Sequence, residues 1–174
     1  MKVVMVAVSS LDGKITRGSS ADIYQWTSGE DAALFSSLVK KHNLIIMGRK
    51  TYEAARKKIR FSPGKLRVVL TKSPGNFKDK EGLEFTGKHP IKLLRDMEAR
   101  GYERALVAGG GAVNALFLKN NLVDEVWLTV EPCMFGKGKS LVEGAVKTQL
   151  VLIGTKKLNK RGTLHLKYKV KSKA

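Results

Sequence analysis

Cysteine is almost absent from the sequence, which has only Cys133 among its 174 residues. A single thiol excludes an internal disulfide framework and a metal site built from several cysteine thiolates. The three histidines, His42, His89 and His165, are scattered along the chain without the short spacing of metal ligands. The sequence therefore predicts a protein of a reducing compartment with no bound metal, and we expect it to be cytoplasmic.

Long apolar runs are also missing. No uninterrupted stretch approaches the ~20 apolar residues of a membrane-spanning helix, and the first residues lead into a short strand-like segment rather than a signal peptide. Hydrophobic residues make up 43% and charged residues 28% of the chain, as in globular proteins. We therefore expect a single domain over residues 1–174 and no membrane partner.

Acidic residues are few, with 15 Asp and Glu against 33 Lys and Arg, so the formal net charge is +18. This charge fits either a non-enzymatic protein that binds nucleic-acid phosphates or a lysine-rich surface that attracts small anions. The basic residues are spread along the chain, and aromatic side chains on which bases could stack are not interleaved with them. We favour a small-molecule ligand and expect no specific nucleic-acid partner.

Three consecutive glycines, Gly109–Gly111, mark the stretch around which the chain is organised. The apolar residues before them predict a buried strand, and Val113, Leu116 and Phe117 after them recur at helical spacing. At such a turn, free backbone N–H groups can bind a phosphate, and glycine lets the main chain approach it closely. A tight turn that needs positive φ would explain the glycines equally well.

Two further segments have the same character. The apolar residues 44–47 are followed by Gly48-Arg49-Lys50-Thr51, and residues 66–70 end in Thr71-Lys72-Ser73, a hydroxyl–cation–hydroxyl cluster suited to a ribose phosphate. Two glycine turns at the ends of parallel strands can lie side by side and hold the two ends of one dinucleotide. The sequence thus predicts a dinucleotide site at one edge of a sheet.

The pattern of apolar segments predicts an α/β fold. Further strands are expected at residues 2–10, 83–85 and 123–132, and residues 150–154 and 164–170 alternate with a period of two, which predicts a closing antiparallel hairpin. Thr27-Ser28-Gly29-Glu30 has the spacing of a capping box, followed by Leu34, Phe35, Leu38 and Val39 as an expected buried stripe. We expect a three-layer αβα architecture with a mixed, mostly parallel sheet.

Four motifs lie in order along the chain: Ser9-x-Leu11-Asp12-Gly13-Lys14, Met47-Gly48-Arg49-Lys50-Thr51-Tyr52-Glu53, Gly109–Gly111, and Val123-Asp124-Glu125-x-x-Leu128-Thr129-x-x-Pro132-x-x-x-Gly136-x-Gly138. Together they resemble the dihydrofolate-reductase-like superfamily, and most closely the reductase domain of riboflavin-biosynthesis deaminase-reductases. The resemblance covers nearly the whole chain. It implies the dihydrofolate-reductase-like fold, an NADPH-dependent reductase, and a homodimer formed through the last strands.

The resemblance also implies roles for individual residues. The cofactor would be held by Gly48, Arg49, Lys50 and Thr51, by Thr71, Lys72 and Ser73 around the 2′-phosphate, and by Gly109, Gly110, Gly111, Ala112, Val113 and Asn114 around the pyrophosphate. Thr16 and Trp26 would lie beside the nicotinamide. Asp12, Lys14 and Lys40 would contact the substrate.

Two departures bear on the substrate. The riboflavin enzymes have an Asp-x-Pro-x-Leu-x-x-Arg run that binds substrate where this chain has residues 52–56, and a glutamate where it has Ala108. Folate reductases share Trp26, Asp31 and Phe35, but their arginine for the glutamate tail corresponds to Lys65, which lacks a bidentate fork. The first candidate activity is reduction of 5-amino-6-(5-phosphoribosylamino)uracil, and the alternative is dihydrofolate or pterin reduction.

Hydride transfer needs mainly positioning and one proton donor. Water or one of three acids, Asp12, Asp31 and Glu131, would supply the proton. Each acid also has a purely structural interpretation: Asp12 as a turn residue before Gly13, Asp31 as a favoured acid in the first turn of a helix, and Glu131 as an exposed residue at a strand end. The sequence leaves the donor open.

Overall fold

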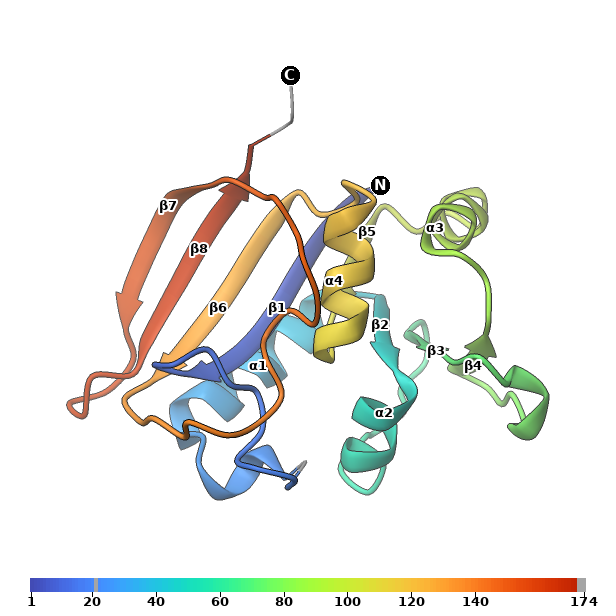
Figure 1. Ribbon diagram of the computed structural model, residues 1–174. Helices are drawn as coiled ribbons and strands as arrows, with labels where there is room; N and C mark the ends of the chain where they lie inside the picture. The colour runs from blue at the N-terminus through green and yellow to red at the C-terminus, as the bar shows by residue number, and fades with distance from the viewer. Residues whose placement is uncertain (21, 172–174) are drawn as a thin grey trace.

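The computed structural model describes residues 1–20 and 22–171, which form one eight-stranded sheet in the order β4-β3-β2-β5-β1-β6-β8-β7 (Figure 1). The strands are β1 (Lys2–Ser10), β2 (Leu44–Gly48), β3 (Leu66–Leu70), β4 (Leu83–Thr86), β5 (Arg104–Val107), β6 (Glu125–Glu131), β7 (Leu150–Lys157) and β8 (Leu164–Val170). Strands β1 to β6 pair in parallel, and β8 is antiparallel to both β6 and β7. The expected mixed sheet and its closing hairpin are confirmed.

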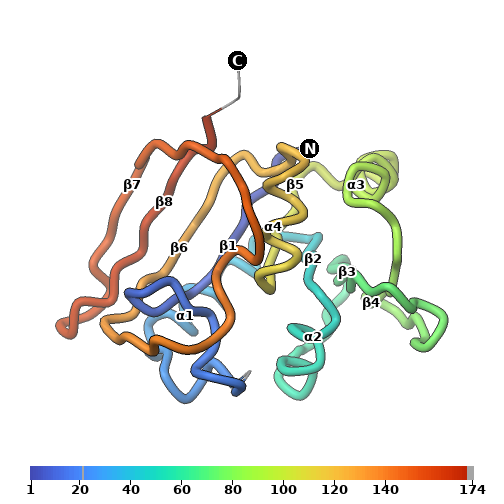
Figure 2. The backbone as a smooth tube through the Cα atoms, viewed as in Figure 1, coloured from blue at the N-terminus to red at the C-terminus, as the bar shows by residue number. Residues whose placement is uncertain are grey.

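Helices cover both faces of the sheet, as the tube in Figure 2 also shows. They are α1 (Gly29–Lys41), α2 (Arg49–Ala55), α3 (Pro90–Ala99) and α4 (Gly111–Lys119), with short 3₁₀ turns η1 (Ile23–Gln25) and η2 (Pro74–Asn76). Val3 and Met5 of β1 pack with α3 and α4, whereas Val4 and Val6 pack on the other face with Leu38 of α1. Because successive side chains of a strand point to opposite faces, β1 contributes to both cores. The sheet that contains it is the middle of the three expected layers.

Helix α1 begins one residue later than its capping-box spacing predicts. Ser28, not Thr27, is the N-cap, and its hydroxyl accepts from the backbone N–H of Asp31. The carboxyl end of α1 is capped by Lys65, whose ammonium donates to the carbonyls of Val39, Lys40 and His42 at 2.8–3.0 Å. Three donors meet three acceptors, so this ammonium is fully used inside the protein.

The stripe expected to be buried on α1 is only partly so. Leu38 is buried, Leu34 and Val39 are half-buried, and Phe35 is 38% exposed. These side chains face the cavity described below instead of a closed core. An apolar stripe has the same helical spacing whether a core or a ligand covers it, so the pattern alone does not separate the two.

The segment between β6 and β7 crosses back to the start of α4. Its backbone is held by Glu143 N–H on Gly111 O at 3.1 Å and Leu141 N–H on Gly13 O at 3.0 Å. A Cβ built on Gly111 would lie 2.4 Å from the carbonyl oxygen of Ser140, so the segment packs directly on this glycine. None of the described helices has both the length and the hydropathy needed to span a bilayer.

Candidate active site

A cavity of about 1260 Å³ lies at the carboxyl ends of β1, β2, β3 and β5. Helices α1 and α2 and the start of α4 border these strand ends (Figure 1). In α/β sheets this edge is where ligands bind, because loops and helix N-termini meet there. Of the predicted cofactor residues, all three glycine and hydroxyl clusters line it: Gly48–Thr51, Thr71–Ser73 and Gly109–Asn114. The structure therefore brings together three segments that are well separated in the sequence.

The two glycine turns are joined directly. The N–H of Gly48 donates to Gly109 O at 2.7 Å, as expected for neighbouring strands β2 and β5. A Cβ added to Gly48 would lie 3.0 Å from Val113 Cγ2, and one added to Gly110 would lie 3.3 Å from Thr51 Oγ1. Gly109 has φ +81°, which other residues adopt rarely. The glycines thus serve both the turn geometry and the close approach of the two segments.

The start of α4 offers hydrogen-bond donors to the cavity. The first N–H groups of a helix have no intrahelical acceptor. Within residues 1–20 and 22–171, the N–H groups of Gly111, Ala112 and Val113 have no acceptor either. Together with the positive end of the helix dipole, they form a cradle whose chemistry fits a phosphate group.

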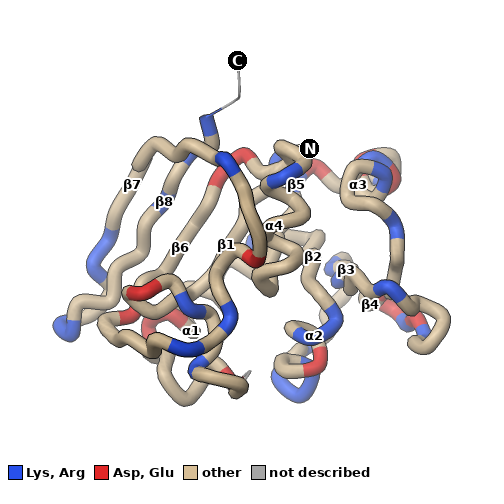
Figure 3. Tube along the Cα trace, in the orientation of Figure 1, with Lys and Arg blue, Asp and Glu red and all other residues tan. Residues whose placement is uncertain are grey.

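Basic side chains outnumber acidic ones in the cavity wall. Ten Lys and Arg residues line it against the two acids Asp31 and Glu143; the basic residues are Lys40, Arg49, Lys50, Lys58, Arg60, Lys65, Arg67, Lys72, Lys88 and Lys139. Figure 3 shows basic positions at α2 and the segment after it. Gly48 is paired with Leu70, so Arg49 and Lys72 follow at the same end of neighbouring strands. The wall attracts anionic ligands.

Arg67 of β3 lines the cavity and is almost fully buried, a role that the sequence did not indicate. It is 5% exposed, and its Nη2 donates to Arg60 O at 2.8 Å while its buried Nη1 has no partner among the described residues. Burial lowers the pKa of Arg67. No carboxylate of the described chain lies within 4.0 Å of this guanidinium. A buried cation without a counter-ion adds to the positive potential of the wall.

Asp31 is the predicted acid that reaches the cavity. It is 7% exposed and lines the cavity together with Thr129 of β6. Burial raises the pKa of Asp31 to about 6; the polar Thr129 hydroxyl lowers it, and the negative charge of Glu131 raises it. The helix start is capped by Ser28, so the Asp31 side chain is not needed as a cap. Thr129 also lines the cavity; it belongs to the fourth sequence motif, but the motif alone assigned it no role.

The other two acids serve the structure. Glu131 is buried, not exposed as its strand-end position suggested, because β8 and the start of α1 cover it. Its two oxygens accept from Ser28 N–H and from the Thr163 hydroxyl, both at 2.7 Å. Asp12 accepts from the Ser10 hydroxyl at 2.6 Å and from the N–H groups of Phe135 and Gly136, and these hydrogen bonds lower its pKa to about 2. Neither acid lines the cavity.

Of the remaining predicted contact residues, some line the cavity and others lie outside it. Lys14 does not line the cavity, although Lys40 does. Trp26 is also outside it, because its ring packs edge-on against Phe135 with centroids 5.1 Å apart. Thr16 does line the cavity, but its hydroxyl donates to Gly18 O at 3.0 Å and accepts from Lys139 N–H at 2.8 Å. These contacts tie Thr16 and Trp26 to the loop after β6.

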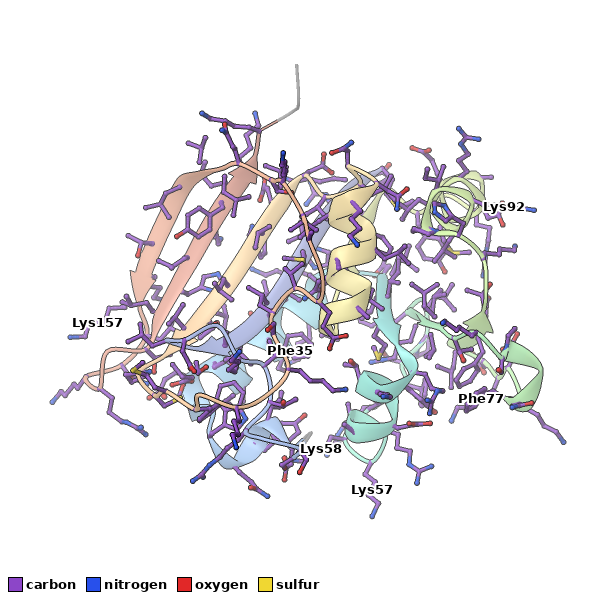
Figure 4. All side chains as sticks on the ribbon, viewed as in Figure 1. Phe35, Lys57, Lys58, Phe77, Lys92 and Lys157 are labelled. Atoms are coloured by element: carbon purple, nitrogen blue, oxygen red, sulfur yellow. The ribbon has the colours of Figure 1, made fainter. Side chains whose placement is uncertain are left out.

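The cavity mouth is bridged by a contact that the sequence did not indicate. The Lys58 ammonium lies 3.0 Å from the centroid of the Tyr24 ring, which joins the segment after α2 to η1. Figure 4 shows Lys58 on the α1 side of α2, whereas Lys57 points away from it; Phe35 lies near α1. An ammonium over an aromatic ring is attracted by the electron-rich face, so this pair holds the two sides of the mouth together.

Comparison with known proteins identifies the family. The model of the RibD C-terminal domain matches residues 1–167. The chain belongs to the RibD C-terminal domain family. Family membership and fold make it a reductase of the riboflavin-pathway or dihydrofolate-reductase-like type.

Individual proteins are similar to the chain in sequence or in fold. The chain is 29% identical over 168 residues to the uncharacterized protein YwjB of Bacillus subtilis, covering 94% of this chain and 96% of that protein. RibD of Acinetobacter baumannii superposes with a TM-score of 0.77 at 17% identity, covering 98% of this chain and 58% of that chain. Dihydrofolate reductase of Enterococcus faecalis, solved with NADP(H), superposes with a TM-score of 0.68 at 18% identity over 98% and 97% of the chains.

Proposed function

We propose that the protein is an NADPH-dependent reductase of a small anionic heterocycle. The observation that carries the proposal is the shared cavity: the free N–H groups at the start of α4 and the buried Asp31 carboxyl group line the same space. NADPH would supply the hydride. The chain's own residues would hold its pyrophosphate at Gly110–Val113 and its 2′-phosphate between Arg49 and Lys72.

Asp31 is suited to supply or position the proton. Since its pKa is about 6, a fraction of its carboxyl groups is protonated near neutral pH, and the proton lies in a water-poor part of the cavity. A carboxyl group in this state can donate to a ring nitrogen of a heterocycle and thereby make the neighbouring carbon more electrophilic. Asp12 and Glu131 are occupied by structural hydrogen bonds, so Asp31 is the proposed catalytic acid.

The wall of the cavity favours a phosphorylated substrate. The excess of basic lining residues suits a sugar phosphate, with 5-amino-6-(5-phosphoribosylamino)uracil as first candidate. A dihydropterin is the second candidate, favoured by the Asp31–Thr129 pair in the cavity. Lys65 has all three donors bound to carbonyls of α1 and is therefore poorly placed to bind the glutamate tail of folate.

A substrate panel tests the proposal. NADPH oxidation is followed with 5-amino-6-(5-phosphoribosylamino)uracil, its dephosphorylated ribosyl analogue, dihydropterin and dihydrofolate. We expect the highest kcat/KM for the phosphorylated substrate and a clear loss for its dephosphorylated analogue. A higher kcat/KM for dihydropterin would establish the second candidate, and failure of all four to oxidise NADPH would contradict the proposal.

A further inference from the structure

Glu143 is an acid of the cavity wall that the proposed reaction leaves without a role; of the described residues, only Asp31 and Glu143 bring a carboxyl group to this wall. It lies in the segment between β6 and β7, which Figure 1 shows passing beside the start of α4. Its backbone N–H donates to Gly111 O at 3.1 Å. A Cβ built on Gly111 would lie 2.9 Å from Glu143 Cγ and 3.4 Å from its carboxyl carbon. The carboxylate is therefore held beside the first residue of α4.

No basic side chain neutralises this carboxylate. Within residues 1–20 and 22–171, Glu143 takes part in no ion pair within 4.0 Å, although ten Lys and Arg residues line the same cavity. The N–H groups of Gly111, Ala112 and Val113 at the start of α4 also lack an acceptor in this part of the chain. An unpaired negative charge thus stands at the edge of the N–H cradle that is proposed to bind the cofactor pyrophosphate.

This negative charge acts unequally on different phosphates. Each phosphate of a dinucleotide is a diester with one negative charge, whereas a terminal phosphate carries about −1.5 to −2 near neutral pH. Coulomb repulsion is proportional to the charge of the ligand. In the high dielectric of an exposed site, a carboxylate about 6 Å away weakens binding by about threefold for one charge and by about tenfold for two.

The rest of the cavity wall offers no such discrimination. Its basic residues attract any phosphate, and more strongly the more charge that phosphate carries. Selection between two attractive ligands requires an element that repels one of them more than the other. Among the described residues, Glu143 is the acid that stands at the start of α4.

We propose that Glu143 makes the α4 cradle selective for the singly charged phosphates of a dinucleotide and against terminal, doubly charged phosphates. The inference rests on the proposed function, because it takes the cradle to be the site of the cofactor pyrophosphate. The carboxylate weakens both kinds of ligand, so the selectivity lowers the affinity for the cofactor itself. An acid at this position also stabilises the helix dipole, but that role alone would leave the affinities of both ligands unchanged when the charge is removed.

Two probes test the selectivity without any substrate. Inorganic pyrophosphate has two terminal phosphates, whereas NADH has the dinucleotide pyrophosphate and no 2′-phosphate that would bind elsewhere. Glu143→Gln keeps the shape of the side chain and removes its charge. Glu81→Gln is the matched control, because Glu81 is exposed and lies outside the cavity, so that the net charge changes equally.

Calorimetry gives the affinities of the two probes. We expect Glu143→Gln to bind inorganic pyrophosphate about tenfold more tightly than the wild type and NADH at most about threefold more tightly. Glu81→Gln should change neither affinity. High salt should reduce the difference between the probes, because it screens the carboxylate.

Amide NMR locates the probes through the signals of Gly111 and Ala112, which should shift with both probes in Glu143→Gln. If NADH leaves these signals unshifted, the cradle is not the cofactor site, and that part of the proposed function fails together with the inference. If pyrophosphate alone leaves them unshifted, something other than Glu143 excludes it and the inference is wrong. Equal gains for both probes, or no gain, would refute the selectivity while the cofactor site stands. Weaker NADH binding in Glu143→Gln would mean that the carboxylate accepts a hydrogen bond from the cofactor, which also overturns the proposal.

Discussion

At the scale of single residues, Asp31 shows how surroundings determine function. Its position in the first turn of α1 is where an acid is favoured by the helix dipole alone, so the sequence supported a structural role. In the structure the Ser28 hydroxyl makes the cap, and the Asp31 side chain enters the cavity beside Thr129. Its raised pKa means that the folded protein destabilises the charged carboxylate. Such a cost to stability is typical of a functional group.

Asp31→Asn is expected to lower kcat/KM by roughly 10²- to 10⁴-fold, the usual contribution of a general acid, and to leave NADPH affinity unchanged. It should also stabilise the protein at neutral pH. The native carboxyl group, with a pKa of about 6, retains its proton at pH values where the unfolded one has lost it. Stability of the wild type therefore falls as the pH rises from the unfolded pKa to about 6, by roughly 3 kcal/mol.

Thermal unfolding at two pH values provides the measurement. Asp31→Asn should unfold at a higher temperature than the wild type at pH 7.5, and the gain should shrink toward pH 4. A gain of the same size at both pH values would show that the carboxyl charge is not its cause.

Residue roles were only partly predictable from the sequence. The cofactor residues at Gly48–Thr51 and Gly109–Asn114 could be predicted as cavity-lining because glycine turns after apolar strands have a local signature. Arg67 had no such signature, because a lone residue in a strand enters a site only through the packing of distant elements. Trp26 and Asp12 were assigned by resemblance, and their neighbours Phe135 and Gly136 come from a loop more than 100 residues away.

At the scale of elements, the turn between β5 and α4 is the feature on which cofactor binding depends. Gly110→Asp would place a carboxylate at the proposed phosphate position and is expected to abolish NADPH binding. Gly110→Ala is the matched control, because its Cβ meets Thr51 Oγ1 at the same 3.3 Å but carries no charge. Calorimetry should show a far larger loss of affinity for the aspartate variant. Equal losses in two folded variants would show that steric contact, not charge, is responsible.

The ends of β2 and β3 should decide between NADPH and NADH. A charge-assisted contact to the 2′-phosphate contributes about 1.5–3 kcal/mol, which corresponds to roughly ten- to hundredfold in affinity. Arg49 is paired with Glu53 at 2.7 Å and 40% exposed, so it must be shared with or released from that acid. The double variant Lys72→Glu, Arg49→Ser is expected to weaken NADPH by at least tenfold and leave NADH nearly unchanged. If the affinities for NADPH and NADH fell equally, these residues would instead contact the pyrophosphate or maintain the fold.

At the scale of the whole molecule, the edge strand β7 is the least protected part of the described structure. Leu150, Val151, Leu152 and Ile153 are consecutive and each 42–51% exposed, so apolar side chains cover both faces of an unpaired edge. Soluble proteins usually protect such edges with charges or a partner. The antiparallel pairing of β7 with β8 was predictable from the alternation of the two segments. The exposure of β7 was not, because its position at the edge depends on the whole sheet.

We therefore keep the homodimer as a prediction and expect β7 to lie in its interface. Light scattering at micromolar concentration should give the mass of a dimer, and Leu152→Lys with Ile153→Lys should give a monomer that remains folded. Val151 is left unchanged so that the strand retains its propensity. A wild-type protein that is monomeric at this concentration would contradict the prediction.

The central claim, hydride transfer from NADPH in this cavity, is tested most directly by isotope transfer. NADPH carrying deuterium at C4, prepared separately with the label on each face, is incubated with the protein and either 5-amino-6-(5-phosphoribosylamino)uracil or dihydropterin, and the product is analysed by mass spectrometry. We predict a product one mass unit heavier from one of the two labelled cofactors, with the wild type and not with Gly110→Asp. Unlabelled products from both cofactors and both substrates would contradict the account.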